Sequence, residues 1–294
     1  MPLTDEQVRQ FQENGVLAAE GVVTDDNLAP VIAEYEAWID ARARALHAEG
    51  KIGDLFPEET FEKRFARLYE QSTEIEKSMD VMYVRGRALF EFLRCDNLLD
   101  AVESLLGTSE ITCNPIQHIR AKVPSAEMGN NYYNVPWHQD LGVTTEDADE
   151  SNILTCWVAL ADATVENGCM EVLPGVFKTG LLPHRAGPGG ATIKEEAMPD
   201  VAPLPVPVKK GGVVFMHRLT PHRSTPNFTD GVRWSLDLRY QPTGQPTGRA
   251  WWPEFVARSI ANPGSVLTDY ELWRDRWIEA LAHSANIGAK HRTS

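Results

Sequence analysis

The spacing of apolar residues changes at about Gly107, and this change limits what the chain can fold into more than any other feature. Before Gly107, apolar side chains recur at helical spacing. The capping-box pair Thr4 and Gln7 marks the start of a first helix, and Gly15 marks its end. The spacing predicts helices from Thr4 to Phe11, from Asp25 or Asp26 to just before Gly50, and over about 58–79, 86–93 and 98–106.

After Gly107 the chain offers short β-branched and aromatic runs separated by Gly, Pro and Asn clusters. Many short strands with turn residues between them favour a β-sandwich or barrel. Apolar residues at helical spacing predict a terminal helix over 267–282. The candidate strands are 111–123, 153–160, 170–173, 206–208, 213–216 and 234–240, with an earlier one at 16–23.

We therefore expect an α+β fold with a mainly β core. The chain of 294 residues is predicted to form a single domain over 1–294, because this length suits one large core. Within it we expect a mainly helical scaffold over 1–106, the β core over 107–243 and a C-terminal helical extension over 244–294.

Charge and cysteine content exclude several kinds of partner. The formal net charge is −14, which disfavours nucleic-acid binding but allows a local basic pocket for a small anion. No apolar stretch approaches the ~20 residues needed to cross a bilayer, and no secretory signal opens the chain. The four widely spaced cysteines favour a reducing compartment. We expect a cytoplasmic protein with a small-molecule substrate and neither nucleic acid nor membrane as partner.

Two segments carry residues that can bind a metal. In an extended segment, side chains two apart share a face, so His138 and Asp140 in VPWHQD can converge on one point. Alone, this pair is as well explained by a hydrogen bond. His222 follows a second apolar strand that begins at Gly211 and Gly212. Two histidines and one carboxylate occupy one face of an octahedral ion and leave the other positions open, as in non-haem Fe(II) oxygenases.

A candidate anion site follows the third metal-binding residue. Arg233 lies in an apolar strand, where a buried charge needs a partner, and a guanidinium binds carboxylates through two hydrogen bonds. Ser224 can add a hydroxyl donor to the same anion.

The sequence resembles the phytanoyl-CoA dioxygenase family of iron(II)- and 2-oxoglutarate-dependent oxygenases. The resemblance runs from the helical start TDEQVRQFQENGVL through Tyr240. It rests on WHQD, on WVALADATVENGCMEVLPGVFK and on GGVVFMHRLTPHRSTPNFTDGVRWSLDLRY. It implies a double-stranded β-helix of jelly-roll type, similar to cupins, wrapped by helices at both ends.

The resemblance also implies roles for residues of this chain. His138, Asp140 and His222 match the iron ligands and would be the catalytic centre, with Fe(II) as metal and 2-oxoglutarate and O2 as cosubstrates. Arg233 and Ser224 match the residues that bind the distal carboxylate of 2-oxoglutarate. Further cosubstrate contacts are expected from Thr155, Trp157 and Gln117.

Related halogenases replace the carboxylate ligand by a small residue, so the presence of Asp140 favours hydroxylation over halogenation. We expect a dioxygenase that oxidises a small organic molecule and releases succinate and CO2. Desaturation, epoxidation and ring formation remain alternatives within this class. The alternatives outside it are an inactive relative that binds metal and 2-oxoglutarate, and a zinc hydrolase with the same three ligands. The sequence indicates neither the substrate nor the oligomeric state.

Other nearby residues are assigned structural roles. His217 lies five residues before His222, so on one strand the two would face opposite ways. His184 opens a stretch from Pro183 to Pro207 that is dense in Gly, Pro and Ala. This stretch predicts a long loop that helps to select the substrate.

Overall fold

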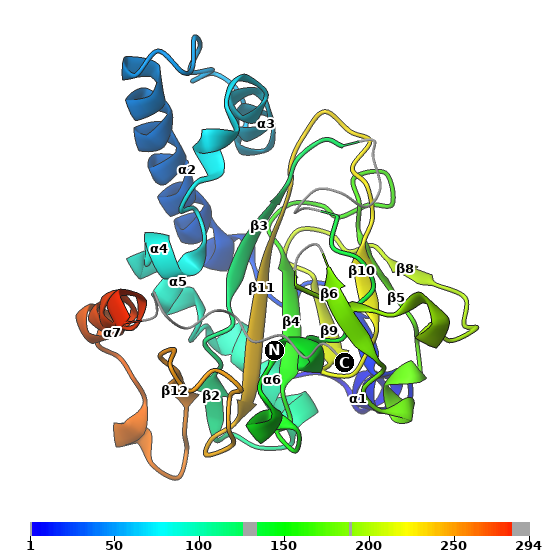
Figure 1. Ribbon diagram of the computed structural model, residues 1–294. Helices are drawn as coiled ribbons and strands as arrows, with labels where there is room; N and C mark the ends of the chain where they lie inside the picture. Colours follow the sequence, from blue (N-terminus) through cyan, green and yellow to red (C-terminus); the bar gives the residue numbers. More distant parts are fainter. Residues whose placement is uncertain (1, 126–133, 188–189, 284–294) are drawn as a thin grey trace.

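Helices pack against one face of a large antiparallel sheet, and a smaller sheet faces the other side (Figure 1). The computed structural model describes residues 2–125, 134–187 and 190–283. The helices are α1 (Asp5–Asn14), α2 (Asp25–Ala48), α3 (Phe61–Gln71), α4 (Val81–Val84), α5 (Arg87–Phe92), α6 (Asp96–Leu106) and α7 (Tyr270–His283).

The capping residues place the first helices close to where the sequence predicts them. The Thr4 hydroxyl accepts from the backbone N–H of Gln7, and the Gln7 side chain accepts from the backbone N–H of Thr4. Gly15 then ends α1 with φ 71°, a left-handed conformation that glycine adopts without strain. The cap of α2 is Thr24 rather than either of the two aspartates that follow it.

The large sheet has seven strands in the order β1-β9-β4-β11-β2-β12, with β3 also paired to β11. All of its described pairings are antiparallel. Its strands are β1 (Val16–Ala19), β2 (Ile111–Cys113), β3 (His118–Lys122), β4 (Leu154–Ala159), β9 (Val213–His217), β11 (Arg233–Pro242) and β12 (Phe255–Arg258).

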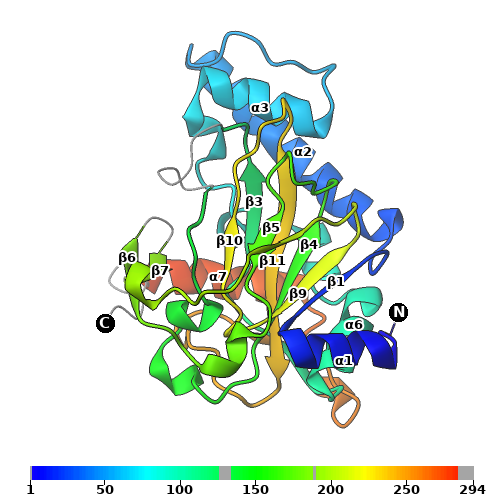
Figure 2. The ribbon, with the colours of Figure 1, turned by 90° about the vertical axis from the view of Figure 1, so that its right-hand side faces the viewer.

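Alternating side chains divide the core into two parts. On β4, Cys156 and Val158 join the large core beneath the helices. Trp157 and Ala159 point the other way, into a smaller core between the two sheets. The smaller sheet has the order β10-β5-β8 and consists of β10 (His222–Ser224), β5 (Met170–Val172) and β8 (Leu204–Val206). In Figure 2, β10 and β5 lie in front of β11, β4 and β9.

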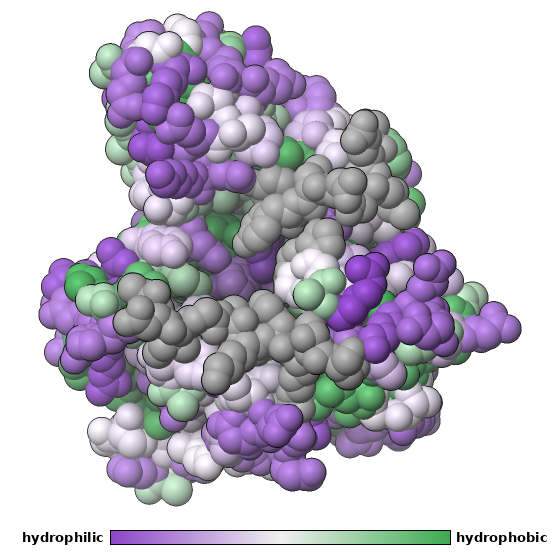
Figure 3. All heavy atoms as spheres, in the orientation of Figure 1, coloured by the Kyte–Doolittle hydropathy of each residue, from purple (hydrophilic) through white to green (hydrophobic). Residues whose placement is uncertain are grey.

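These two facing antiparallel sheets, covered by helices, confirm the predicted α+β fold with a jelly-roll core. No helix in the described part of the chain is long and apolar enough to span a bilayer. Hydrophilic residues cover most of the molecular face seen in Figure 3, as expected for a chain in which 24% of residues are charged.

The structure corrects three details of the prediction. The strand predicted over 111–123 is two strands, because Pro115 lies between them and has no N–H for a ladder. The long loop predicted from Pro183 to Pro207 contains a hairpin, β6 (His184–Gly187) and β7 (Gly190–Ile193), as well as β8. The short strands β10 and β12 were not predicted. The division into 1–106, 107–243 and 244–294 stays a prediction, and residues 284–294 lie outside the described part.

Candidate metal centre

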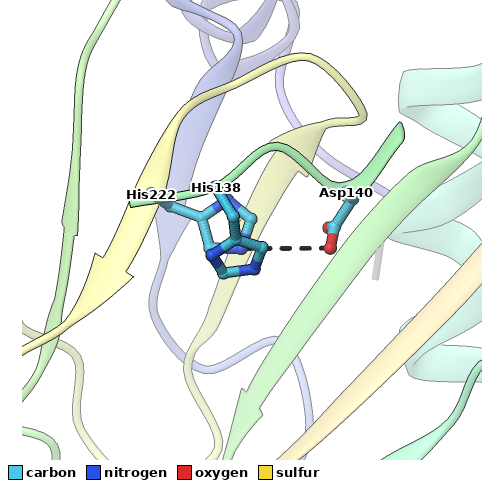
Figure 4. A group of neighbouring side chains, drawn as sticks. All are labelled: His138, Asp140 and His222. Carbon is cyan, nitrogen blue, oxygen red and sulfur yellow. Dashed lines mark ion pairs between the residues drawn. The ribbon is translucent and has the colours of Figure 1, made fainter. Parts of the chain in front are cut away.

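Three side chains from two segments of the chain converge in the wall of one cavity. The ligand atoms of His138, Asp140 and His222 all lie within 4.8 Å of one another. The two imidazole centroids are 4.1 Å apart, and Nε2 of His222 lies 4.0 Å from Oδ1 of Asp140. Figure 4 shows the two rings side by side with the carboxylate facing them.

Backbone pairing brings the two histidines together. His138 and His222 are directly opposite in an isolated antiparallel bridge, with N–H to O distances of 3.1 and 3.0 Å. The backbone at Gln139 is extended, and its side chain donates to the carbonyls of Gly180 and Leu219. His138 and Asp140 therefore lie on the same side of the segment, although Asp140 begins a short 3-10 helix (Asp140–Val143) rather than a strand.

Each imidazole presents the nitrogen that a metal would bind. Nδ1 of His138 lies 2.9 Å from the carbonyl oxygen of Pro136, and Nδ1 of His222 lies 3.0 Å from that of Thr220. Because a carbonyl oxygen can only accept, both Nδ1 atoms carry a proton, which leaves Nε2 of each ring as the nitrogen available to a metal. Burial, together with His222, lowers the pKa of His138 to about 3, so this ring is neutral at physiological pH.

The carboxylate is held on both of its oxygens. The Thr155 hydroxyl donates to Oδ2 of Asp140, and the Arg239 guanidinium donates to Oδ1. Burial by itself raises the pKa of Asp140, but the charge of Arg239, helped by the hydrogen bond from Thr155, holds the pKa well below its usual range. Asp140 is therefore ionised. Two imidazoles and an ionised carboxylate are the donor set that Fe(II) binds in non-haem oxygenases.

A second cationic group lies at the other end of β11. Arg233 is 3% exposed, and its Nη1 donates to the hydroxyl of Ser235 at 2.8 Å. Its buried Nε has no hydrogen-bond partner among the described residues. Across the β3–β11 ladder from Arg233 lies Lys122, whose Nζ donates to Ser224 Oγ at 2.6 Å.

Burial lowers the pKa values of both basic side chains at the Arg233 end of β11. Burial, together with Arg233, lowers the pKa of Lys122 to about 6, and burial lowers the pKa of Arg233 to about 10. A carboxylate bound beside Arg233, Lys122 and the Ser224 hydroxyl would supply the opposite charge and so favour the charged form of both basic groups. The geometry thus fits a small dicarboxylate with one end near the metal ligands.

The structure distributes the three further cosubstrate candidates differently. Trp157 lines the cavity, and the guanidinium of Arg233 lies 4.8 Å from its ring centroid. Thr155 contacts the metal ligand Asp140 instead. Gln117 is a correction: it does not line the cavity, and its amide donates to Cys113 Sγ and to the Asn114 carbonyl. The alternation of β3 explains this, since His118, Arg120 and Lys122 face the cavity and Gln117 is out of step with them.

Two other histidines stay outside the metal-binding group. His217 ends β9, and its ring lies 4.9 Å from that of Phe177. His184 is buried on β6, where Nε2 accepts from the backbone N–H of Gln139 at 3.3 Å. His184 therefore supports the segment that carries the metal ligands.

His138, Asp140, His222, Trp157, Ser224 and Arg233 border one cavity of about 350 Å³. Four of the five Lys and Arg side chains that line it were not predicted from the sequence: Arg120, Lys122, Arg239 and Arg249. The signal that identified Arg233, a charge within an apolar strand, also applies to Lys122 and Arg239. Arg249 lies in a polar turn and carries no such signal.

Comparisons with known proteins agree with this geometry. The family model for phytanoyl-CoA dioxygenase (PhyH) matches residues 11–235. The peroxisomal phytanoyl-CoA dioxygenase of Rattus norvegicus is 27% identical over 247 residues, covering 81% of this chain and 68% of its own. A probable phytanoyl-CoA dioxygenase of Caenorhabditis elegans is 24% identical over 308 residues and covers 97% of this chain and 95% of its own.

Solved structures share the fold at lower identity. The non-heme monooxygenase ThoJ aligns with a TM-score of 0.64 at 20% identity, covering 94% of this chain and 95% of its own. The epimerase SnoN, solved with Fe3+, alpha ketoglutarate and a nogalamycin compound, aligns with a TM-score of 0.56 at 21% identity, covering 84% and 88%.

Proposed function

The chain belongs to the phytanoyl-CoA dioxygenase family of iron(II)- and 2-oxoglutarate-dependent oxygenases, and from this premise we propose that it hydroxylates a small organic substrate. The observation that carries the proposal is the placement of His138, Asp140 and His222, with both Nε2 atoms and the carboxylate turned to one point. We assign the metal to these three residues.

Each residue of the site has a task in this reaction. Bound iron(II) would supply the redox chemistry that activates O2. Arg239 and Thr155 orient the carboxylate of Asp140, and the Nδ1 hydrogen bonds orient the two imidazoles. Arg233, Lys122 and Ser224 would bind the distal carboxylate of 2-oxoglutarate, which directs its other end to the metal ligands.

The overall reaction balances as a mixed-function oxidation. One oxygen atom of O2 enters a carboxylate of succinate as 2-oxoglutarate loses CO2. The other oxygen atom replaces a substrate C–H bond by C–OH. Halogenation is disfavoured because Asp140 fills the ligand position that halogenases leave to halide. Desaturation, epoxidation and ring formation stay alternatives for the same cavity.

The two alternatives from other classes are separated from an oxygenase in different ways. A zinc hydrolase needs the three ligands but has no use for buried cations at the far end of the cavity, where Arg233 and Lys122 lie. An inactive relative that binds metal and 2-oxoglutarate would keep the same residues, and turnover of 2-oxoglutarate separates it from an oxygenase. Free thiols at all four cysteines support our proposal of a cytoplasmic location.

The origin of the oxygen in succinate tests the proposed function. Protein prepared without oxygen is supplied with iron(II) and 2-oxoglutarate and then exposed to ¹⁸O₂, and succinate is analysed by mass spectrometry. We expect iron-dependent succinate carrying one labelled oxygen, formed slowly without the primary substrate. Zinc-loaded protein is the control and should form none. Iron-loaded protein that binds 2-oxoglutarate but never yields labelled succinate would contradict the proposal.

A further inference from the structure

Arg249 is another buried guanidinium that lines the cavity, and no acid of the described residues forms an ion pair with it. Arg249 is 3% exposed and lines the cavity. Its Nη1 donates to the carbonyl of Gly248 at 3.2 Å, and its buried Nε has no partner among the described residues. A guanidinium has five N–H donors, and a buried charge with one neutral acceptor is costly. A bound anion would accept from the remaining N–H donors and supply the opposite charge.

The turn that carries Arg249 is fixed against the segment after the metal ligands. The backbone N–H of Thr145 donates to the carbonyl of Gly248 at 3.2 Å, and the Thr247 hydroxyl accepts from the backbone N–H of Arg249 at 3.2 Å. The guanidinium lies 5.6 and 5.8 Å from the ring centroids of Trp251 and Trp252, within cation–π range. The side chain is therefore held in place before any ligand binds.

Arg249 has the same surroundings as Arg233. Each is 3% exposed, donates to one neutral oxygen, has a buried Nε without a partner and lies near an indole ring. Arg239, which lies close enough to Arg249 to lower its pKa, stands six residues from Arg233 on β11. Six strand residues span roughly 20 Å. Arg249, which lies near Arg239, and Arg233 therefore border opposite ends of one cavity.

The charges around the cavity leave Arg249 uncompensated. Among the described residues that line it, five are Lys or Arg and two are Asp, in a chain with net charge −14. The two aspartates, Asp140 and Asp237, lie 4.0 Å or less from the guanidinium of Arg239. The distal carboxylate of 2-oxoglutarate would compensate the end with Arg233 and Lys122. Arg120, the fifth cationic side chain, lies close enough to Asp80 to lower the pKa of that carboxyl. Among the described residues of the cavity wall, Arg249 is then left without an opposite charge.

We propose that Arg249 binds a carboxylate of the primary substrate, so that this substrate is a small carboxylic acid. One planar guanidinium matches a carboxylate with two parallel hydrogen bonds. Trp252, Ile116 and Val143 line the same cavity and would contact the apolar body of the substrate. The cavity of about 350 Å³ must also hold the cosubstrate, which limits the substrate to a small molecule. The inference rests on the proposed function, since it assigns the Arg233 end to 2-oxoglutarate.

Binding of simple acids to the complete protein tests this assignment. Manganese(II) replaces iron(II) so that no turnover occurs, and 2-oxoglutarate is kept saturating. The probes are hexanoate, phenylacetate and indole-3-acetate, each compared with its neutral primary amide by calorimetry. We expect at least one acid to bind more tightly than its amide. Arg249→Gln should lower the affinity for that acid by about tenfold or more. Arg249→Lys keeps the charge and should retain part of the affinity.

Replacing Arg249 and Arg233 separately distinguishes a failure of this inference from a failure of the proposed function. Arg249→Gln should keep 2-oxoglutarate binding, which also shows that the variant is folded. Arg233→Gln should lose affinity for 2-oxoglutarate. In titrations without 2-oxoglutarate, it should keep its affinity for the acid. If no acid is preferred to its amide, or Arg249→Gln binds acid and amide as wild type does, the inference is wrong and the proposed function stands. If 2-oxoglutarate binding does not depend on Arg233, the proposed function is what fails.

Discussion

At the scale of single residues, the contact between Arg239 and Asp140 is central to the metal centre. Both side chains are buried, and the guanidinium donates to one oxygen of the carboxylate while Thr155 donates to the other. Partners of this kind orient a ligand atom and fix its charge state. Arg239 is therefore a positioning residue for the metal-binding carboxylate.

Removing this guanidinium should weaken metal binding. We expect Arg239→Met to lower affinity for manganese(II) by about 10- to 100-fold, because the carboxylate loses the donor that orients it. Arg258→Met is the matched control, since Arg258 pairs with Asp96 and Asp100 on another part of the molecule. Equilibrium titration of the metal measures the difference. Equal affinities in the two variants would remove Arg239 from the metal centre.

Local pattern explains which residues of the site could be predicted from sequence. His138 and Asp140 are two residues apart and Arg233 stands in an apolar strand, so short stretches identified them as candidates, and the structure brings them to one cavity. Gln117 was misplaced because the alternation of the strand depends on where it begins after Pro115. Arg239 contacts Asp140 across 99 residues, and no short-range pattern records such a pairing.

At the scale of elements, the turn between β4 and β5 supports the cation at the far end of the cavity. Gly168 has φ 84°, and a Cβ there would lie 2.5 Å from Cε of Lys122 and 2.5 Å from the carbonyl oxygen of Thr225. The absence of a side chain at this turn therefore leaves room for the Lys122 side chain that donates to Ser224.

Adding a methyl group at this turn should disturb both stability and cosubstrate binding. We expect Gly168→Ala to lower the free energy of unfolding by about 2–4 kcal/mol through left-handed strain and overpacking, and to weaken 2-oxoglutarate binding. Gly175→Ala is the control, because Gly175 has φ 77° but nothing within 4 Å of the added atom. It should cost about 1 kcal/mol and leave binding unchanged. Denaturant unfolding and calorimetry compare them, and identical behaviour would refute the role of Gly168.

One hairpin was not predicted because its composition is typical of a loop. The stretch from Pro183 to Pro207 has the composition of a loop, yet His184–Gly187 pairs with Gly190–Ile193. The N–H of Ile193 also donates to the carbonyl of Trp137 at 2.8 Å, and composition does not report a contact between segments so far apart in sequence. The strand β11 was predicted from its own sequence, because its residues include a run of apolar and aromatic side chains.

At the scale of the whole molecule, the helices and the large sheet share one core. Trp234 on β11 stacks on Phe61 with 4.5 Å between ring centroids and meets Phe65 edge-on at 5.0 Å. Both phenylalanines belong to α3, so the scaffold and the sheet bury each other's apolar faces.

A shared core predicts that the chain unfolds as one unit. We expect urea unfolding followed by far-UV circular dichroism and by tryptophan fluorescence to give coincident transitions, because loss of the helices exposes the sheet. Trp234→Leu should move both midpoints together to lower urea. A helical transition well separated from that of the sheet would show that the single-domain prediction is wrong.

Iron-dependent succinate formation by ligand variants tests the central claim most directly. Wild-type protein, His138→Ala, His222→Ala and His217→Ala are each loaded with iron(II) and given 2-oxoglutarate and O2. We predict succinate from the wild type and from His217→Ala, whose histidine lies outside the metal-binding group, and none from the other two. Succinate formed at the wild-type rate by His138→Ala or His222→Ala would contradict the assignment of the metal centre.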